Sequence, residues 1–530
     1  MLAHRIFVFC CCDSWNIYNF STLCSLDSRL PHGSLEYYKI CGEPRNGNRQ
    51  TGRSRKLETR LAPPITVRAN RDNLDNPLST ALGNILGYDT HMFPNPQDAL
   101  PIPKRPNVEQ YKKLAQELLR TAKSNDSDAI RKWSESWVKG LVKRSGIEIT
   151  PRLPVRIDNW IQEVAAFAQE KLTDGSKLSD AQFVIARSHG FPVWSAFVRH
   201  IRNMADKGSS EAQFEAAADA IITGKIAVLR RLLRAHPKLV YRRSSREHHA
   251  TLLHYVSANG VEGYRQKTPK NIVEITDLLL RAGADVNAGA DVYGGHCTAL
   301  GLVATSVHPQ EAGVQPPLMQ LLLDHGALMD TPGIAGRNHL LVLACLANGQ
   351  PDAASFLAER GAPLDLETAA GIGKLDVVKR AFDADGKLKP PATQQQLQNG
   401  FLWACMCGHE DVAVFLLDHG ADLHGPADSG ATALHWAAGA GKVELVKLLI
   451  QRGAALEVIN RWGGTVLEHA GYGFEHKRSD VNFVPTFEML LASGAKIRGG
   501  WLKWIRKVNS RSSKERKLLA EVFHRHGAAE

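Results

Sequence analysis

The sequence predicts an all-α protein in which pairs of helices stack one after another. Leu-rich runs that end in a Gly-Ala pair recur at Gly283, Gly326, Gly361, Gly420, Gly453, Gly494 and Gly527. Their spacing indicates a period near 33 residues, with insertions and one deletion. The runs between these pairs also have the three- and four-residue apolar periodicity of helices. A short helical unit repeated at this period predicts a solenoid, because each unit buries its apolar face only against its neighbours.

The most regular copy is TALHWAAGAGKVELVKLLIQRGAAL, at residues 432–456. In its VELVKLLIQ part only Glu444, Lys447 and Gln451 are polar, which leaves one solvent stripe on an otherwise apolar helix. Such a helix has to be covered on both sides, and neighbouring copies provide that cover. Gly453 follows this helix, and we expect it to adopt the left-handed conformation that ends it.

This period, the TALH stretch and the Gly-Ala pairs resemble those of the ankyrin repeat family, in which two antiparallel helices lead into a hairpin-like loop. The resemblance covers residues 212–530 as about eight or nine copies, and is most specific at 401–424 and 432–457. It implies that Thr432 starts the first helix of its copy and that His435 returns a hydrogen bond to the Thr or to local backbone.

The same tie is expected of Thr251 and His254 in TLLH. Gly301 in TALG and Glu468 in TVLE stand where the His would be, so these two copies are expected to lack part of the tie. The predicted structural ties of the repeats are therefore Thr251, His254, Thr432, His435, Gly283, Gly326, Gly361, Gly420, Gly453 and Gly494.

A helical domain is predicted at residues 107–205, before the repeats. Apolar periodicity predicts helices at 108–122 and 158–168. The segment LSDAQFVIARSHGFPVWSAFVRHI then predicts one helix with Ser179 as its N-cap and Gly190 at its end, and another after Pro192. The words DAQFVIARSHGFPVWSAF resemble the helical region that precedes the repeats in a group of bacterial ankyrin proteins.

Residues 178–203 also suit a helix-turn-helix that reads DNA, because Arg199, His200 and Arg202 follow the turn. Against this alternative, Trp194, Phe197, Val198 and Ile201 share one helical face. Most of the second helix is therefore committed to packing.

Residues 501–508 raise the same question, because Trp501 and Trp504 alternate with Lys and Arg. Their common helical face predicts a capping repeat with a solvated basic rim. Nucleic acid is thus disfavoured as a partner, although the basic C-terminus keeps the alternative open.

The net charge of +11 does not form one positive field. Residues 1–210 and 498–530 are basic, whereas 211–497 carry 26 Lys and Arg against 30 Asp and Glu. No run approaches the roughly 20 apolar residues of a membrane span. Five of the nine cysteines lie in residues 1–41, which does not suit a disulfide framework and favours a reducing, cytoplasmic location.

Residues 1–91 show no sustained helical or strand period. We expect a disordered segment or a spurious extension, with translation starting near Met92 as one alternative. A secretory signal fits poorly, because the apolar run at residues 6–12 is short and no small-residue cleavage site follows.

Two motifs suggest chemistry, but the repeat explains both. Cys405, Cys407 and His409 in CMCGHE are close enough to suggest a metal, yet no second ligand cluster stands at zinc spacing. GIGKLD, from Gly371, lacks the third Gly and the preceding strand of a nucleotide loop. No nucleophile stands in a recognisable signature. We therefore predict no catalytic, cofactor or metal residues.

The predicted function is a non-enzymatic protein-protein interaction module or scaffold, a monomer whose protein partner the sequence does not name. Binding is expected at the concave face of the repeats and at three insertions between helices, residues 261–272, 306–317 and 473–485. Insertions at matching places line one face and often bind ligands, whereas the alternative is extra loop length without a role.

Overall fold

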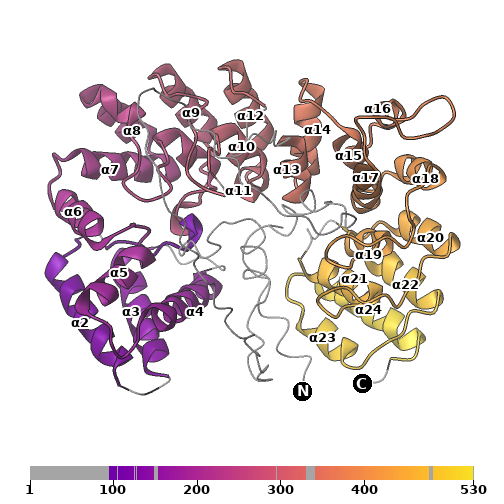
Figure 1. Ribbon diagram of the computed structural model, residues 1–530, viewed down its shortest axis with the longest axis horizontal. Helices are drawn as coiled ribbons and strands as arrows, with labels where there is room; N and C mark the ends of the chain where they lie inside the picture. The colour runs from indigo at the N-terminus through magenta and orange to yellow at the C-terminus, as the bar shows by residue number, and fades with distance from the viewer. Residues whose placement is uncertain are drawn as a thin grey trace, which may run out of the picture. The chain divides into compact units, whose positions relative to one another are not determined.

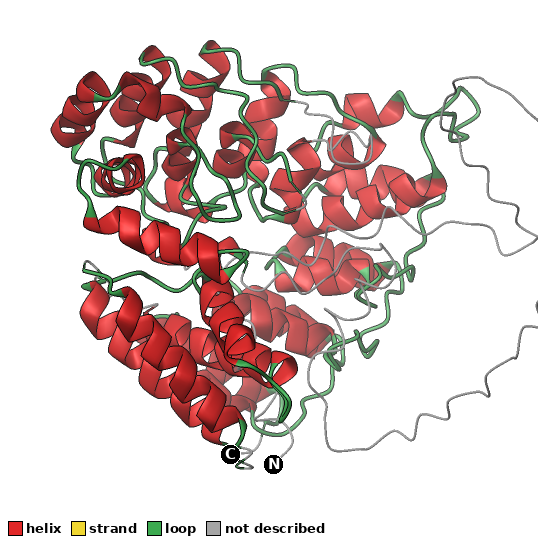
Figure 2. Ribbon diagram, turned by 60° about the vertical axis from the view of Figure 1, so that its left-hand side comes forward, coloured by secondary structure: helices red, strands yellow, loops and turns green. Residues whose placement is uncertain are grey.

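The computed structural model describes residues 95–103, 105–124, 126, 128–147, 153–293, 295–329, 341–476 and 481–528. These residues belong to one compact unit. The expectations for residues 1–91 and for a start near Met92 lie outside the described residues. Where the chain is described, all regular elements are helices and no strand occurs (Figure 2). The predicted all-α class is thus confirmed.

A helical domain comes first along the chain. Its elements are η1 (Pro96–Asp98), α2 (Val108–Ala122), α3 (Ala129–Ser145), α4 (Leu153–Lys171), α5 (Leu178–Ser188) and α6 (Trp194–Ala205). Helix α2 contacts α3, α5 and α6, while α4 contacts α3 and α5. Trp160, Phe191 and Phe197 are completely or almost completely buried in the shared core.

Three details of this domain differ from the sequence prediction. Helix α3 was not expected, although Trp133, Trp137 and Leu141 stand four residues apart on it and face the core. Helix α4 extends beyond the predicted residues 158–168 at both ends. Ser179 is not the N-cap of α5, because the helix begins at Leu178 and the carboxylate of Asp180 accepts a hydrogen bond from the Lys177 N–H at 2.7 Å.

Nine helix pairs follow among the described residues (Figure 1). The first four are α7 (Ser210–Ile222) with α8 (Ile226–Ala235), η3 (Leu252–Ser257) with α9 (Ile272–Arg281), α10 (Ala299–Ala304) with α12 (Gln315–Asp324), and α13 (Leu341–Ala347) with α14 (Pro351–Glu359). The next five are α15 (Leu366–Gly371) with α16 (Leu375–Lys379), α17 (Gln394–Cys407) with α18 (Glu410–Asp418), α19 (Ala433–Gly439) with α20 (Val443–Gln451), α21 (Val466–His476) with α22 (Val484–Ala492), and α23 (Trp501–Lys507) with α24 (Ser513–Arg525). Short elements between the pairs are η2 (Pro237–Tyr241), η4 (Gly263–Arg265) and α11 (Val307–Glu311).

Like helices stack on like helices along the chain. First helices contact first helices, as in α15 with α17, α17 with α19 and α19 with α21. Second helices contact second helices, as in α9 with α12, α20 with α22 and α22 with α24. Each pair therefore depends on the next for the cover of its apolar surface, as in other repeat proteins.

The two helices of a pair differ in composition because they differ in burial. Every residue of α19 is buried, and four of its seven residues are Ala or Gly, so neighbouring first helices approach closely. In α20, Leu445, Val446 and Leu449 are buried, whereas Glu444 and Lys447 are exposed. Burial of each Leu or Val side chain stabilises the stack by about 1.5–3 kcal/mol.

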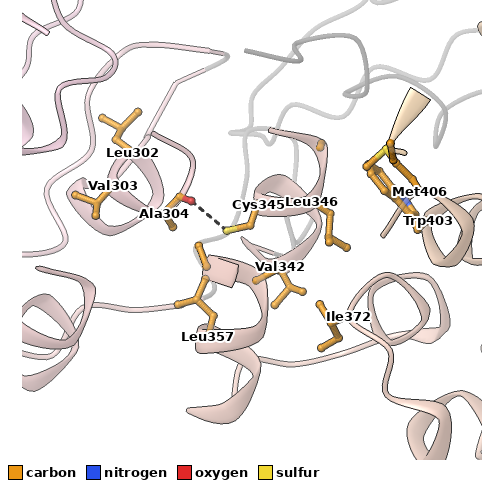
Figure 3. Close-up of a cluster of buried hydrophobic side chains, with 14 of the residues drawn as sticks. Leu302, Val303, Ala304, Val342, Cys345, Leu346, Leu357, Ile372, Trp403 and Met406 are labelled. Atoms are coloured by element: carbon orange, nitrogen blue, oxygen red, sulfur yellow. Dashed lines mark hydrogen bonds between the residues drawn. The ribbon is translucent and has the colours of Figure 1, made fainter. Parts of the chain in front are cut away.

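The core continues from one repeat to the next without interruption (Figure 3). Ala304 of α10 lies beside Cys345 of α13, and the Cys345 thiol lies 3.6 Å from the Ala304 carbonyl oxygen. Burial raises the pKa of this thiol. Cys345 therefore acts as a small core residue with an un-ionised thiol.

Candidate partner-binding surface

The predicted ties lie at the start of the first helix of two repeats. Thr432 donates its backbone N–H to Nδ1 of His435 at 3.2 Å, and its hydroxyl lies 2.9 Å from the same nitrogen. Thr251 and His254 repeat this arrangement at 3.0 and 2.8 Å. Because Nδ1 accepts the backbone N–H, the proton of the neutral ring is on Nε2.

His254 also joins its repeat to the next one. Its Nε2 donates to the Ala288 carbonyl oxygen at 2.9 Å and lies 3.2 Å from that of Cys297. Burial lowers the pKa of His254 to about 4, although these carbonyls partly oppose the shift. Burial likewise lowers the pKa of His435 to about 4. Both rings are therefore neutral at pH 7 and act as structural ties.

The two divergent copies behave differently from each other. Thr298 accepts the Gly301 N–H at 3.3 Å, but Gly301 has no side chain to return a bond. At the other copy the Glu468 carboxylate accepts the Thr465 N–H at 2.7 Å. The expectation that this copy lacks part of the tie is wrong, because the Glu468 carboxylate accepts the Thr465 N–H as the His ring does elsewhere.

The predicted glycines follow the second helices and have positive φ. The angles are +95° at Gly283, +84° at Gly326, +90° at Gly361, +97° at Gly420, +92° at Gly453 and +96° at Gly494. Residues other than Gly are strained in this conformation. These positions end the second helices and direct the chain into the hairpin-like loops.

The loops of successive repeats are fastened to one another. Gln398 of α17 donates its amide to the carbonyl oxygens of Asp422 and Gly425, both at 3.0 Å, and accepts the Asp422 N–H at 2.8 Å. Arg461 of the next loop donates its backbone N–H to the Ser429 carbonyl oxygen at 2.8 Å. We call loops 421–432 and 454–465 together the loop edge.

The same fastening occurs earlier in the stack. The Asn287 side chain donates to the Gly326 carbonyl oxygen at 3.0 Å and accepts the Leu328 N–H at 2.9 Å. A large apolar side chain is exposed at each place, with 55% of Leu328 accessible beside the Asn287 bonds and 54% of Ile459 accessible in the loop edge. Ordered backbone beside exposed apolar groups suits recognition of another protein.

The first insertion, residues 261–272, does not form an exposed loop. Val261, Glu262, Gly263 and Arg265 are buried. Tyr264 packs against the core of the helical domain, and a Cβ at Gly263 would lie 2.5 Å from the Gln97 carbonyl oxygen. The sequence predicted a binding surface at this insertion, whereas residues 261–263, 265 and 266 are buried. The insertion fills the junction between the helical domain and the first repeats.

A buried cluster of four charges holds this junction. Arg246 Nη1 lies 2.8 Å from Glu215 Oε1 and 2.7 Å from Glu262 Oε1. Arg265 Nη2 lies 2.7 Å from Glu215 Oε2, and its Nη1 lies 3.4 Å from Glu262 Oε1. Burial opposes ionisation of Glu215, but Arg246 and Arg265 lower its pKa to about 2. The two cations and two carboxylates are therefore charged together and balance each other.

Sequence reasoning missed this cluster. Its residues come from α7, from the loop before η3 and from the insertion, up to 50 residues apart. The one signal was the insertion itself, a run of mixed polar residues at a place where the repeat requires none. No pattern in that run separates a buried polar segment from an exposed one.

The other insertions are less buried. In 306–317 the side chain of Gln315 donates to the Val303 and Ser306 carbonyl oxygens at 3.0 and 3.2 Å, while residues 311–313 are exposed. In 473–485, residues 477–480 lie outside the described residues. The buried Arg511 reaches this insertion from the loop after α23 and donates to the carbonyl oxygens of Phe474 and Val481, at 2.5 and 3.1 Å.

In the two candidate nucleic-acid segments, residues 178–203 and 501–508, the His and Trp side chains that could contact bases pack within the protein. His200 is buried, with Nδ1 2.8 Å from the Ser245 hydroxyl, whereas Arg199 and Arg202 are exposed. Trp501 stacks on Phe523 at 4.8 Å between ring centroids, and Trp504 donates its indole N–H to Glu475 at 3.0 Å. These groups pack within the protein, so they are not available to stack on bases.

The remaining motifs lie inside the repeat framework. Cys405 is buried in the core, and burial raises the pKa of its thiol. His409 Nε2 lies 3.2 Å from the Gly371 carbonyl oxygen, in the turn that GIGKLD forms between α15 and α16. Within the described residues no group of three His, Cys, Asp or Glu side chains is arranged to hold a metal ion. The same residues include no helix with the length and apolar character needed to cross a membrane.

Stacked helix pairs with Thr-His ties and left-handed glycines define a repeat solenoid. The family described as ankyrin repeats (3 copies) matches residues 366–460. Residues 366–460 therefore carry ankyrin repeats, as predicted, and proteins of this family are typically interaction modules without enzymatic activity.

The chain is also similar to solved structures. A solved structure similar to the chain is the crystal structure of the ankyrin repeat domain of Bcl-3, described as a unique member of the IkappaB protein family. It is 20% identical, with 52% of this chain and 97% of that chain covered, at a TM-score of 0.25. No curated protein matches the chain.

Proposed function

We propose that this protein is a non-enzymatic scaffold that binds a protein partner at the loop edge and the adjoining concave face of its repeats. One observation carries the proposal: the loops are fastened from repeat to repeat. Gln398 bonds to the first loop, and Arg461 bonds the second loop to the first. A surface ordered before binding loses little conformational entropy when a partner docks.

The helical domain contributes a fixed end to this binding module. The insertion at 261–272 fills the junction, and the Glu247 N–H donates to the Gly190 carbonyl oxygen at 3.0 Å. We propose that residues 107–205 cap the first repeat and that the repeats at 212–530 bind the partner. Terminal repeats need such cover, because a neighbour is present on only one side.

We also propose a cytoplasmic monomer. Cys345 and Cys405 are free thiols that pack as core residues, which suits a reducing compartment. The proposal includes no cofactor.

The test is affinity capture with the full-length chain. The immobilised protein should retain a protein partner from a lysate of its native cells, identified by mass spectrometry. Ile459→Asp adds a charge to an exposed apolar side chain of the loop edge, and should abolish that retention. Leu518→Asp is the matched control, because Leu518 is also exposed, at 42%, but lies on α24 away from the loop edge.

Two results would contradict the proposal. One is equal capture by wild type, Ile459→Asp and Leu518→Asp, which would place the contact elsewhere. The other is retention on random-sequence DNA with a steep salt dependence and no protein captured, which would favour a nucleic-acid partner. Deletion of residues 261–270 is unsuitable as a test, because it would remove the buried charges of the junction.

A further inference from the structure

Residues 220–246, in the first repeat, contain eight Lys and Arg residues and no Asp or Glu. They account for 8 of the 26 cations of residues 211–497 and for none of the 30 acids. The segment includes α8, which is the first of the second helices (Figure 1), and η2. Positive charge concentrated in an otherwise acidic region produces a local field that attracts anions.

Three of the eight cations have partners within the protein. Arg246 belongs to the buried cluster, and Arg242 Nη2 lies 2.7 Å from Glu211 Oε1. Arg243 donates to two backbone carbonyl oxygens at 2.9 and 2.6 Å. The other five are exposed and have no ion-pair partner among the described residues. We call these five the basic face: Lys225, Arg230, Arg231, Arg234 and Lys238.

The centre of the basic face is the exposed side of α8. Arg230 and Arg234 are about one turn apart, and Arg231 is adjacent to Arg230. The remaining exposed residues of the helix are Ala227 and Ala235. In each of the other described pairs, the second helix contains at least one Asp or Glu. The repeat fold therefore does not require an outer helix with cations alone.

The basic face is narrow, because the next second helix carries acids. Helix α8 contacts α9, where Glu274 is exposed and Asp277 pairs with Arg281 at 2.8 Å. These carboxylates repel a broad anionic surface such as a membrane, whereas a single chain fits the width of one helix. The exposed residues of α8 also include no large apolar side chain, which a helix that lies in a membrane surface requires.

The basic face also lacks the aromatic side chains of a nucleic-acid groove. Proteins that bind single strands combine cations with several aromatic rings on which the bases stack. Helix α8 has no aromatic residue. Tyr241 of η2 is 63% exposed, but it lies against the next repeat, since a Cβ at Gly283 would be 2.6 Å from its hydroxyl. The chemistry of the face therefore favours carboxylates as the bound anions.

We propose that the basic face binds an acidic protein segment in an extended conformation. Alternate side chains of an extended chain are about 6.6 Å apart on one side. Arg230 and Arg234 are separated by about 6 Å along the helix axis. Carboxylates at alternate positions thus meet successive arginines, and each guanidinium donates two parallel N–H bonds. The basic face is separate from the loop edge, so this inference does not rest on the function proposed above.

The test uses the full-length protein and a fluorescein-labelled peptide of five Glu-Ser dipeptides as the probe. Fluorescence anisotropy should show binding that weakens as salt rises, because exposed charges are screened. A peptide of five Gln-Ser dipeptides should not bind. The double variant Arg230→Gln with Arg234→Gln should bind the Glu-Ser peptide about tenfold more weakly, because each exposed ion pair contributes up to about fivefold in affinity.

Two controls separate the basic face from total charge and from the loop edge. Arg199→Gln with Arg202→Gln removes two exposed arginines from α6 and should bind the peptide as wild type does. Ile459→Asp, which tests the loop edge, should also leave peptide binding unchanged. The Arg230 and Arg234 variant should keep the thermal midpoint of wild type, because both side chains are exposed and without ion pairs.

The proposal fails if wild type does not bind the Glu-Ser peptide at low salt, or if the two double variants weaken binding equally. It also fails if vesicles with phosphatidylserine or duplex DNA bind more tightly than the peptide and lose that binding in the Arg230 and Arg234 variant. The face would then recognise phosphate groups. A lower thermal midpoint of that variant would show that the two arginines stabilise the fold, which contradicts a free binding surface.

Discussion

Arg246 and Glu262 form an ion pair with 2.7 Å between Nη1 and Oε1, and at most 1% of either side chain is exposed to solvent. Arg246 comes from the loop before η3, and Glu262 comes from the insertion that follows it. The pair thus connects the insertion to the segment that contacts the helical domain. Its burial makes each charge dependent on the other, because neither has water as a substitute partner.

Glu262→Gln should destabilise the protein strongly. The substitution keeps the shape but leaves Arg246 with less compensating charge, and loss of one partner of a buried pair costs about 3–5 kcal/mol. Urea unfolding followed by circular dichroism measures the change. Asp418→Asn is the control, because its pair with Arg452 spans 3.3 Å at an exposed site and is worth about 1 kcal/mol or less. Equal costs for the two substitutions would contradict a structural role for the buried pair.

Glu367→Gln should stabilise the protein above pH 7. Burial raises the pKa of Glu367 to about 7, although the Trp403 and Asn399 side chains donate hydrogen bonds to it at 2.9 and 3.2 Å. Its ordinary pKa is about 4.5, so the folded state binds more protons between these values and its stability falls as pH rises from 4.5 to 7. The difference corresponds to about 3 kcal/mol.

Unfolding free energies of wild type and Glu367→Gln at pH 4.5 to 8 measure this dependence. The advantage of the variant should grow across that window and then become constant. Asp376→Asn, at a carboxylate of α16 that is 67% exposed, should follow the wild-type curve. A constant difference between wild type and Glu367→Gln at all pH values would show that Glu367 does not titrate in this window.

The sequence was sufficient for the repeats and insufficient for their junction with the helical domain. The Gly-Ala spacing and the TALH motif of Thr432 and His435 are local patterns. They recur in several copies, so each copy supports the assignment of the others. Arg246, Glu262 and Arg265 are polar residues of irregular loops, which a single sequence places on the surface by default. Their burial depends on contacts between segments far apart in the chain. The local periodicity of a sequence gives no information about such contacts.

The loop edge was predictable only in part. The sequence indicates where the hairpin-like loops occur, because they follow the glycines. It does not indicate that Gln398 bonds to residues 422 and 425, since Gln is equally common on exposed helix surfaces. The core of the helical domain was predicted only in part for a related reason, because α3, which supplies Trp137 to that core, was not expected as a helix.

His254→Ala should cost about 2–3 kcal/mol at pH 7, because it removes the bond to Thr251 and the bonds to the next repeat. The pKa of the folded-state ring is lowered to about 4 from 6.5, so its stabilising effect is present above pH 6.5 and is lost as pH falls through 4. The gap between wild type and variant should therefore shrink from pH 6.5 to pH 4. Thermal midpoints at these pH values check the prediction, and a gap that widens in acid would contradict it.

Gly453→Ala should destabilise the protein by about 1–2 kcal/mol through backbone strain alone. Gly453 has a φ of +92°, and no atom lies within 4 Å of the place where its Cβ would be. The cost thus comes from the left-handed conformation and involves no clash. Gly464→Ala is the matched control, because its backbone is not in that region and its nearest neighbour is an ordinary contact at 3.5 Å. Urea unfolding should show a change within about 0.5 kcal/mol for the control. Equal stability of the two variants would mean that the helix end at Gly453 does not require the left-handed conformation.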